Sequence, residues 1–188
     1  MGIRRWQWAR RAATVLVLTA LMLLPAHGHA ATAAEIDSGV DDTLQRFDRE
    51  VDGGHEFLAG AAGALVFPRV IKAGLGIGGE YGEGALRVGG ESVDYYSTTA
   101  ASIGLQAGAQ ARSVIIVFMT DAALERFRNS QGWRVGIDGS VALVDVGAGR
   151  SLDTENIRDP IVGFVFGQRG LMFNVTLEGS RITRLDRE

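Results

Sequence analysis

The sequence predicts an α+β fold: a single domain with a strongly curved, largely antiparallel, barrel-like sheet, an N-terminal amphipathic helix and one or two further helices. Three observations predict it. Apolar residues recur at helical spacing over residues 35–51, apolar and small residues alternate along most of the chain after Gly60, and residues 114–119 form an apolar run rich in β-branched side chains. The 188 residues, 46% of them hydrophobic and 22% charged, suit one well-filled core better than two large domains.

The first 30 residues have the three-part pattern of a secretory signal peptide, which is cleaved from the mature protein. An arginine-rich start precedes an apolar run over residues 12–24, and small residues suited to cleavage end at Ala30 and at Ala33. The apolar run is shorter than the ~20 residues that span a membrane, although an uncleaved anchor is the alternative. We therefore expect a periplasmic or secreted protein. The pair Arg4-Arg5 leaves open whether export follows the Sec or the twin-arginine route.

The predicted mature chain is acidic. Removal of residues 1–30 leaves 15 basic and 22 acidic residues, a formal net charge of −7. A nucleic-acid binder needs a basic surface, so this class is excluded, and any contact with an anionic membrane must be local. The chain contains no cysteine, which excludes disulfides, a cysteine nucleophile, thiolate metal sites and a lipidated N-terminal cysteine.

Residues 31–54 are predicted to carry the N-terminal helix, ahead of the main domain at residues 55–188. Five apolar residues fall within an arc of about 80° on a helical wheel: Ile36, Val40, Leu44, Phe47 and Val51. The helix should end near Gly53-Gly54. Its polar face is acidic, which favours packing on the domain over a place on a membrane surface.

After Gly60 the pattern is mostly that of strands. Before the second helix, strands are expected at residues 64–67 (stopped by Pro68), 75–81, 103–110 and 114–119. That helix should begin with Thr120 or Asp121 as its N-cap, bury Ala123, Leu124 and Phe127, and end within residues 129–132. Later strands are expected at residues 133–137, 141–146, 161–166, 171–177 and 181–185, with turns at 168–170 and 178–180.

Glycine occupies every second position in two of these strands, near residues 74–84 and 102–110. One strand face is therefore bare of side chains, which favours curvature and close packing, with contact to a ligand as the alternative. The literal G-x-G-x-x-G at residues 74–79 lies inside a strand pattern. No helix follows it to hold a pyrophosphate, so no dinucleotide cofactor is predicted.

The residues specify no active site. His55 is the only histidine after residue 30, and its place beside Glu56 near a helix end favours a surface role. No serine has the G-x-S-x-G context of a hydrolase nucleophile. Carboxylates brought together from Glu80, Glu83 and Glu91 remain an alternative. We expect no catalytic residue, no cofactor and no bound metal.

Long glycine-punctuated blocks cover nearly all of residues 55–186: FLAGAAGALVFPRVIKAGLGIGGEYGEGALRV, DYYSTTAASIGLQAGAQARSVIIVFMT, ALERFRNSQGWRVGIDGSVALVDVGAG and PIVGFVFGQRGLMFNVTLEGSRITRL. These blocks resemble the SYLF domain family, which includes a lipid-binding, actin-patch-associated domain of yeast and animal proteins and secreted bacterial proteins. The resemblance implies a non-enzymatic module that binds phosphoinositides or other acidic phospholipids. The chain has no Src-homology-3 or FYVE segment, and it lacks the acylated cysteine of some bacterial members.

Three basic residues are the candidates for binding lipid phosphate: Arg69, Lys72 and Arg87. Arg69 and Lys72 match the basic stretch of the family's FPRVIKAGLGIG block, just after Pro68, and Arg87 lies on the next strand. The alternative for each is an ordinary solvated surface position. Core packing is favoured over a place at the bilayer interface for three aromatic residues: Trp133, Tyr95 and Tyr96.

Together these observations predict an exported, non-enzymatic protein that binds the acidic headgroups of a phospholipid surface at the cell envelope. One alternative is a structural or stress protein of the envelope that binds a protein partner through its curved sheet. Another is a hydrolase with a carboxylate site in residues 78–91.

Overall fold

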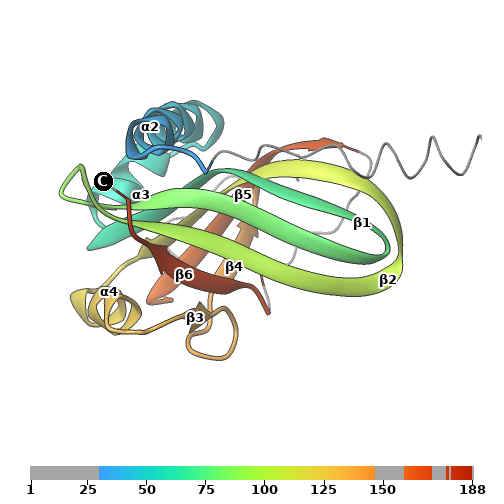
Figure 1. Ribbon diagram of the computed structural model, residues 1–188. Coiled ribbons are helices and arrows are strands. Elements are labelled where there is room, and N and C mark those ends of the chain that lie inside the picture. Colours follow the sequence, from blue (N-terminus) through green and yellow to red (C-terminus); the bar gives the residue numbers. More distant parts are fainter. Residues whose placement is uncertain (1–29, 147–158, 171–176, 178, 188) are drawn as a thin grey trace, which may run out of the picture. The chain divides into compact units, whose positions relative to one another are not determined.

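The computed structural model describes residues 30–146, 159–170, 177 and 179–187. Residues 31–188 form one compact unit, and its described residues have the predicted class: helices packed on a strongly curled sheet of six described strands (Figure 1). Residues 1–29 of the expected signal peptide (residues 1–30) and most of the strand expected at 171–177 lie outside the described residues. Within the described ranges, no helix has both the length and the apolar character needed to cross a bilayer.

The predicted N-terminal helix is confirmed as α2 (Ala33–Glu50). Its N-cap Thr32 accepts a hydrogen bond from the backbone N–H of Glu35, and the Glu35 carboxylate accepts one from the N–H of Thr32. This capping box fixes where the helix begins. The predicted apolar face is the buried one, as Val40 and Phe47 show.

The short helix α3 (Gly54–Ala59) follows at once and was not predicted as a separate element. The second predicted helix is confirmed as α4 (Asp121–Arg128). The Thr120 side chain caps it by accepting from the N–H of Ala123. Its buried residues are those predicted: Ala123, Leu124 and Phe127.

Two long strands replace the four short ones expected in the first half of the domain. They are β1 (Gly63–Val88) and β2 (Glu91–Phe118), paired antiparallel along their whole length. The prediction that Pro68 stops a strand was wrong. The proline sits where the register shifts between Phe67 and Val70, and an irregularity of this kind tolerates a residue without an N–H.

The remaining strands are β3 (Trp133–Arg134), β4 (Ala142–Asp145), β5 (Ile161–Gly170) and β6 (Arg181–Leu185). The sheet order is β3-β6-β2-β5-β4, with β1 on the other edge of β2. Every pairing among the described strands is antiparallel except β4–β5. The turn expected at residues 168–170 was wrong because β5 runs through it, whereas Gly179, with φ +79°, supports the turn expected at 178–180.

The β1–β2 ribbon bends back on itself around Gly74–Gly78 (Figure 1). A Cβ atom placed on Gly74 would lie 2.4 Å from the Cα of Gly78, and one on Gly82 would lie 2.9 Å from the carbonyl oxygen of Arg69. A Cβ on Gly84 would lie 2.0 Å from the carbonyl oxygen of Val66. Close packing therefore explains the glycines at these positions, as predicted.

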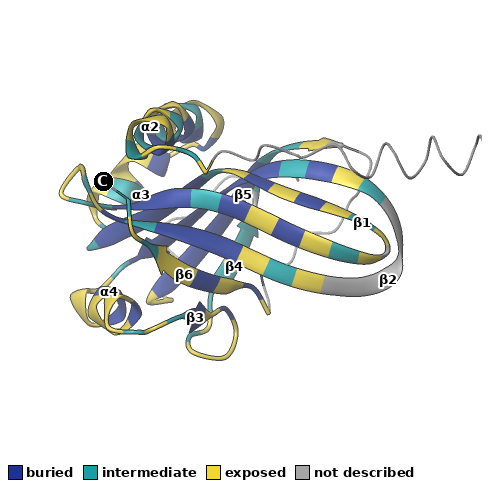
Figure 2. Cartoon of the chain, in the orientation of Figure 1, coloured by how far each residue is buried: buried dark blue, intermediate teal, exposed yellow. Residues whose placement is uncertain are grey.

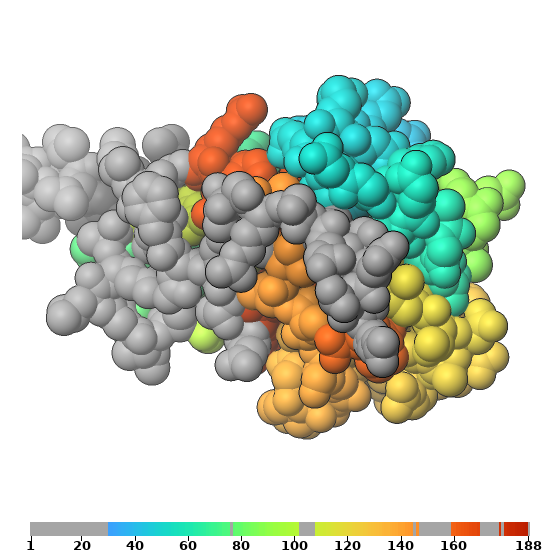
Figure 3. All heavy atoms as spheres, turned by 180° about the vertical axis from the view of Figure 1, so that it is seen from behind, coloured from blue at the N-terminus to red at the C-terminus, as the bar shows by residue number. Residues whose placement is uncertain are grey.

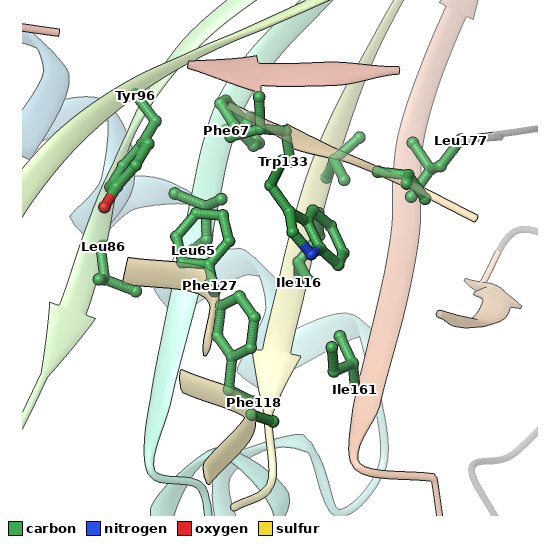
Figure 4. Packing of buried hydrophobic residues seen from close by; sticks show 14 of the residues in the cluster. Leu65, Phe67, Leu86, Tyr96, Ile116, Phe118, Phe127, Trp133, Ile161 and Leu177 are labelled. Carbon is green, nitrogen blue, oxygen red and sulfur yellow. The ribbon is translucent and has the colours of Figure 1, made fainter. Parts of the chain in front are cut away.

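The two faces of the central strands carry separate hydrophobic clusters. One face packs against α2 and α3 around Phe47 and Phe164. The other face packs against α4 and against the end of β1 and the start of β2, which carry Leu86 and Tyr96. The centre of this cluster is formed by Phe118, Phe127 and Trp133 (Figure 4). This two-sided burial explains the unbroken apolar run at residues 114–118.

The predicted core role of the three aromatic residues is confirmed for two of them. Trp133 and Tyr96 are buried in the cluster that packs against α4 (Figure 4). Tyr95 is half-buried, and its hydroxyl donates a hydrogen bond of 2.8 Å to the carboxylate of Asp37 on α2.

Candidate functional site

Arg69 lies at the mouth of a pocket that gathers four arginines. It is exposed on β1, and the pocket, of about 380 Å³, is lined by side chains from α2, β1, β2 and β5. The four arginines are Arg46, Arg69, Arg112 and Arg169, and we call this the arginine pocket. The register of the sheet assembles it, because Ala111 pairs with Arg169 and Ser113 pairs with Phe166.

Arg46 reaches the pocket from α2 and is held there by several contacts. Its Nη2 donates to Ser113 Oγ, which in turn donates to the carbonyl oxygen of Pro68 at 2.7 Å. The guanidinium carbon lies 5.1 Å from the ring centroid of Phe166. A side chain on Gly167 would bring its Cβ within 3.3 Å of that carbon, so the glycine leaves room for the guanidinium. Figure 3 shows the end of β5 beside α2.

Arg112, on β2, also lines the arginine pocket, but its side chain is buried and paired. Its Nη2 lies 2.7 Å from Glu80 Oε2, and both side chains are at least 95% buried. This pair neutralises one of the four positive charges. Within the part of the chain that the structure describes, Arg69 and Arg169 are exposed and form no ion pair with a carboxylate, so the arginine pocket keeps a net positive charge.

The other two candidate residues lie elsewhere. Lys72 is only 7% exposed and sits on the opposite face of β1 from Arg69, because residues three apart on a strand face opposite ways. Arg69 and Lys72 therefore do not share one surface. Arg87 is paired with Asp41 on α2 at 2.6 Å and donates to the carbonyl oxygen of Gly90. It helps to dock α2 on the hairpin, and a lipid-binding role for Lys72 or Arg87 stays a prediction.

The three carboxylates weighed for catalysis are not brought together as a free cluster. Glu80 is buried against Arg112, and Glu83 accepts from the Tyr81 hydroxyl and from Arg187. Glu91 lies on the exposed start of β2. No group of three or more potential metal ligands occurs among the described residues.

His55 lies at the surface, 3.6 Å from an Asp48 carboxylate oxygen. The surface position predicted for this histidine is confirmed.

The arrangement suits the binding of an anion with several oxygen atoms. An arginine guanidinium presents paired N–H donors that match phosphate oxygens, and it stays charged at any physiological pH. Arg46 is already oriented by Ser113 and Phe166, so little side-chain freedom remains to be lost on binding. The buried Nε of Arg46 has no hydrogen-bond partner among the described residues.

Sequence patterns located only one of the four arginines. Arg46 lies on the polar side of the helical wheel, and Arg169 was placed in a predicted turn. Strand register brings Arg112 and Arg169 together and the packing of α2 adds Arg46, and local sequence patterns reveal neither. One signal was present: Arg112 follows a strictly uncharged strand segment and precedes a buried run, which is an unusual place for a charge.

Comparison with known families supports the predicted resemblance. Residues 99–188, the last 90 of the chain, match the family model Ysc84, described as "Las17-binding protein actin regulator". The SYLF resemblance is thereby confirmed for this segment, which includes Arg112 and Arg169. No curated protein matches the chain.

Proposed function

We propose, from the match of residues 99–188 to the Ysc84 (SYLF) family, that this protein is exported and binds acidic phospholipids at the cell envelope without catalysing a reaction. The observation that carries the proposal is the arginine pocket. It brings together Arg46, Arg69 and Arg169, which form no ion pair among the described residues, in a chain whose predicted mature form has a net charge of −7. Such a local concentration of positive charge is what an acidic protein needs to hold a lipid phosphate.

Two further observations support parts of this proposal. The arginine-rich start and short apolar run support export. The engagement of Glu80 with Arg112, and of Glu83 with Arg187, supports a binding role over a carboxylate-based hydrolase.

Flotation with liposomes tests the proposal. The protein should float with vesicles that contain phosphatidylglycerol, float poorly with phosphatidylcholine alone, and detach as salt is raised. The double variant Arg69→Gln/Arg169→Gln removes the two exposed cations of the arginine pocket. Each cation near an anionic bilayer contributes about 1 kcal/mol, so affinity should fall about thirtyfold.

The matched control is Arg49→Gln/Arg126→Gln, which removes the same charge from two exposed arginines outside the pocket. An equal loss in both double variants would show that overall charge, and not the pocket, governs binding. A wild-type protein that floats with neither lipid composition would contradict the proposal. That result would favour a protein partner, a role that the family description also names.

A further inference from the structure

The bent β1–β2 ribbon has its apolar residues outside and its polar residues inside. Along β1, the odd-numbered residues from 71 to 81 are exposed, and Leu75 and Ile77 reach 83% and 74% exposure. The opposite face buries Lys72, Glu80, Gln110 and Arg112. Figure 2 shows the resulting stripes of buried and exposed residues along the ribbon. In a sheet that faces water the distribution is the reverse.

The described part of this outer face carries no charge between Arg69 and Tyr81. On β1 it consists of Ile71, Ala73, Leu75, Ile77, Gly79 and Tyr81. Their described partners on β2 are Thr99, Ala101, Ala109 and Ala111. A continuous exposed apolar face of this kind marks a contact with another apolar surface.

The shape of the ribbon places the most apolar residues farthest from the domain. Leu75 and Ile77 lie on either side of the bend, which we call the apex (Figure 1). Arg69 and Gly82 meet at the base, where a Cβ on Gly82 would lie 2.9 Å from the Arg69 carbonyl oxygen. The six steps along the strand from Arg69 to Leu75 span about 20 Å at 3.3 Å per residue. Arg69 and Tyr81 therefore flank the base, and Arg69 also lines the arginine pocket.

We propose that the apex, with Leu75 and Ile77, inserts into the hydrocarbon of one bilayer leaflet while the arginine pocket at the base of the ribbon lies among the headgroups. The inference rests on the proposed binding of phospholipids. Interfacial segments enter a bilayer by about 5–10 Å, which leaves the base of a tilted ribbon in the headgroup layer. Tyrosine and arginine, the residues at the base, are side chains that favour that layer.

A bilayer fits this face better than a protein partner does. Specific protein interfaces form about one hydrogen bond per 100–200 Å², and the side chains from Ile71 to Gly79 on this face offer no hydrogen-bonding group. Such interfaces also bury about 800 Å² on each partner, which a convex apex carrying two large side chains does not supply. Lipid chains need no matching shape. Among the described strands β1 pairs only with β2, so the backbone groups on its open edge limit insertion to the apex.

A fluorescent label at the apex tests the inference. The chain contains no cysteine, so Ile77→Cys can be labelled specifically with the environment-sensitive dye NBD. With phosphatidylcholine–phosphatidylglycerol vesicles, its emission should rise several-fold, shift to the blue and be quenched by spin labels on the lipid chains. Ile137→Cys is the matched control, because Ile137 is an exposed isoleucine (65%) in the turn after β3. Its emission should not change.

A second variant measures the contribution of the apex to affinity. Leu75→Ser/Ile77→Ser should lower vesicle affinity at least tenfold and leave the unfolding temperature unchanged, since both side chains are exposed. If the wild-type protein floats but the NBD emission at position 77 does not change, insertion of the apex is overturned and the proposed binding of phospholipids is not. A wild-type protein that does not float would overturn both. If the NBD emission at position 77 rises with protein concentration in the absence of vesicles, a second copy of the chain covers this face, and insertion is overturned.

Discussion

Tyr96 shows how one buried polar atom links stability to pH. Its ring packs against Phe127 with centroids 4.9 Å apart, and its hydroxyl is buried without a hydrogen-bond partner among the described residues. Burial, together with the charge of Asp94, raises the pKa of Tyr96 to about 12. The native state therefore holds the phenolic proton more tightly than the unfolded state does.

We predict that Tyr96→Phe removes the part of the alkaline stability loss that ionisation of Tyr96 causes. In the wild-type protein the unfolded tyrosine ionises near pH 10 and the folded one near pH 12, so stability is full below pH 10 and falls between these values. The loss amounts to about 3 kcal/mol. About half of it, roughly 1.4 kcal/mol, has developed at pH 11, and urea unfolding at pH 7 and pH 11 measures this part. The variant should match or exceed wild-type stability at pH 7, because it removes an unpaired hydroxyl. Equal alkaline losses in both proteins would contradict the assignment.

At the scale of elements, the folded-back ribbon depends on glycines at the positions where its two layers touch. Gly84 lies directly against the backbone of Val66, whereas Gly79 has open space beside it. A Cβ atom placed on Gly79 would lie 3.9 Å from its nearest neighbour, the carbonyl oxygen of Ala100. These two glycines share a strand but differ in the space around them. Substitutions at these two positions therefore distinguish the packing role of glycine from its effect on the flexibility of the unfolded chain.

Gly84→Ala should therefore destabilise the protein and Gly79→Ala should not. The new methyl group at residue 84 would lie 2.0 Å from a backbone oxygen, so strands must move apart, at a cost of about 3 kcal/mol or more. At residue 79 the methyl group fits, and reduced freedom of the unfolded chain should stabilise the protein by about 0.5 kcal/mol. The urea midpoints of the two variants measure the difference. Similar midpoints would show that the layers do not pack as described.

The same elements show what sequence can and cannot predict. Helices α2 and α4 were predicted closely because their apolar periodicity is local, as is the Thr120 cap of α4. The long strands were divided wrongly because Pro68 and the glycines are local signals of interruption, which the packing of the ribbon overrides. For the site, Arg69 was identified from its family block. Its partners could not be identified, because strand register depends on contacts between distant residues.

At the scale of the whole molecule, Ala31, the first residue of the predicted mature chain, is tied to the sheet. The backbone N–H of Ala31 donates to Glu83 Oε2 at 3.2 Å, and the other oxygen of Glu83 accepts from Tyr81 and Arg187. Signal cleavage before Ala31 would convert this N–H into an ammonium group beside a carboxylate. It would also keep the Thr32 cap of α2, which cleavage before Ala34 would remove.

We predict that the exported protein begins at Ala31. Intact-mass measurement of the protein recovered from the periplasm or medium distinguishes this start from Ala34. A chain that begins at Ala34 should also be less stable by about 1 kcal/mol, the usual contribution of an N-cap. Recovery of the chain with Met1 in a membrane fraction would contradict cleavage.

The hairpin turn at Gly89-Gly90 has a consequence for the order of folding. Both glycines have positive φ, +61° and +89°, as a tight two-residue turn requires. Val88 and Glu91, the pair next to the turn, are three positions apart, whereas Gly63 and Phe118 at the far end are 55 apart. The β1–β2 pairs can therefore form one after another, starting at the turn. Each new pair then closes only a short additional loop, so the entropy of loop closure is lost in small steps. We expect the turn to form early, so that changes there slow folding, while changes near Gly63 mainly speed unfolding.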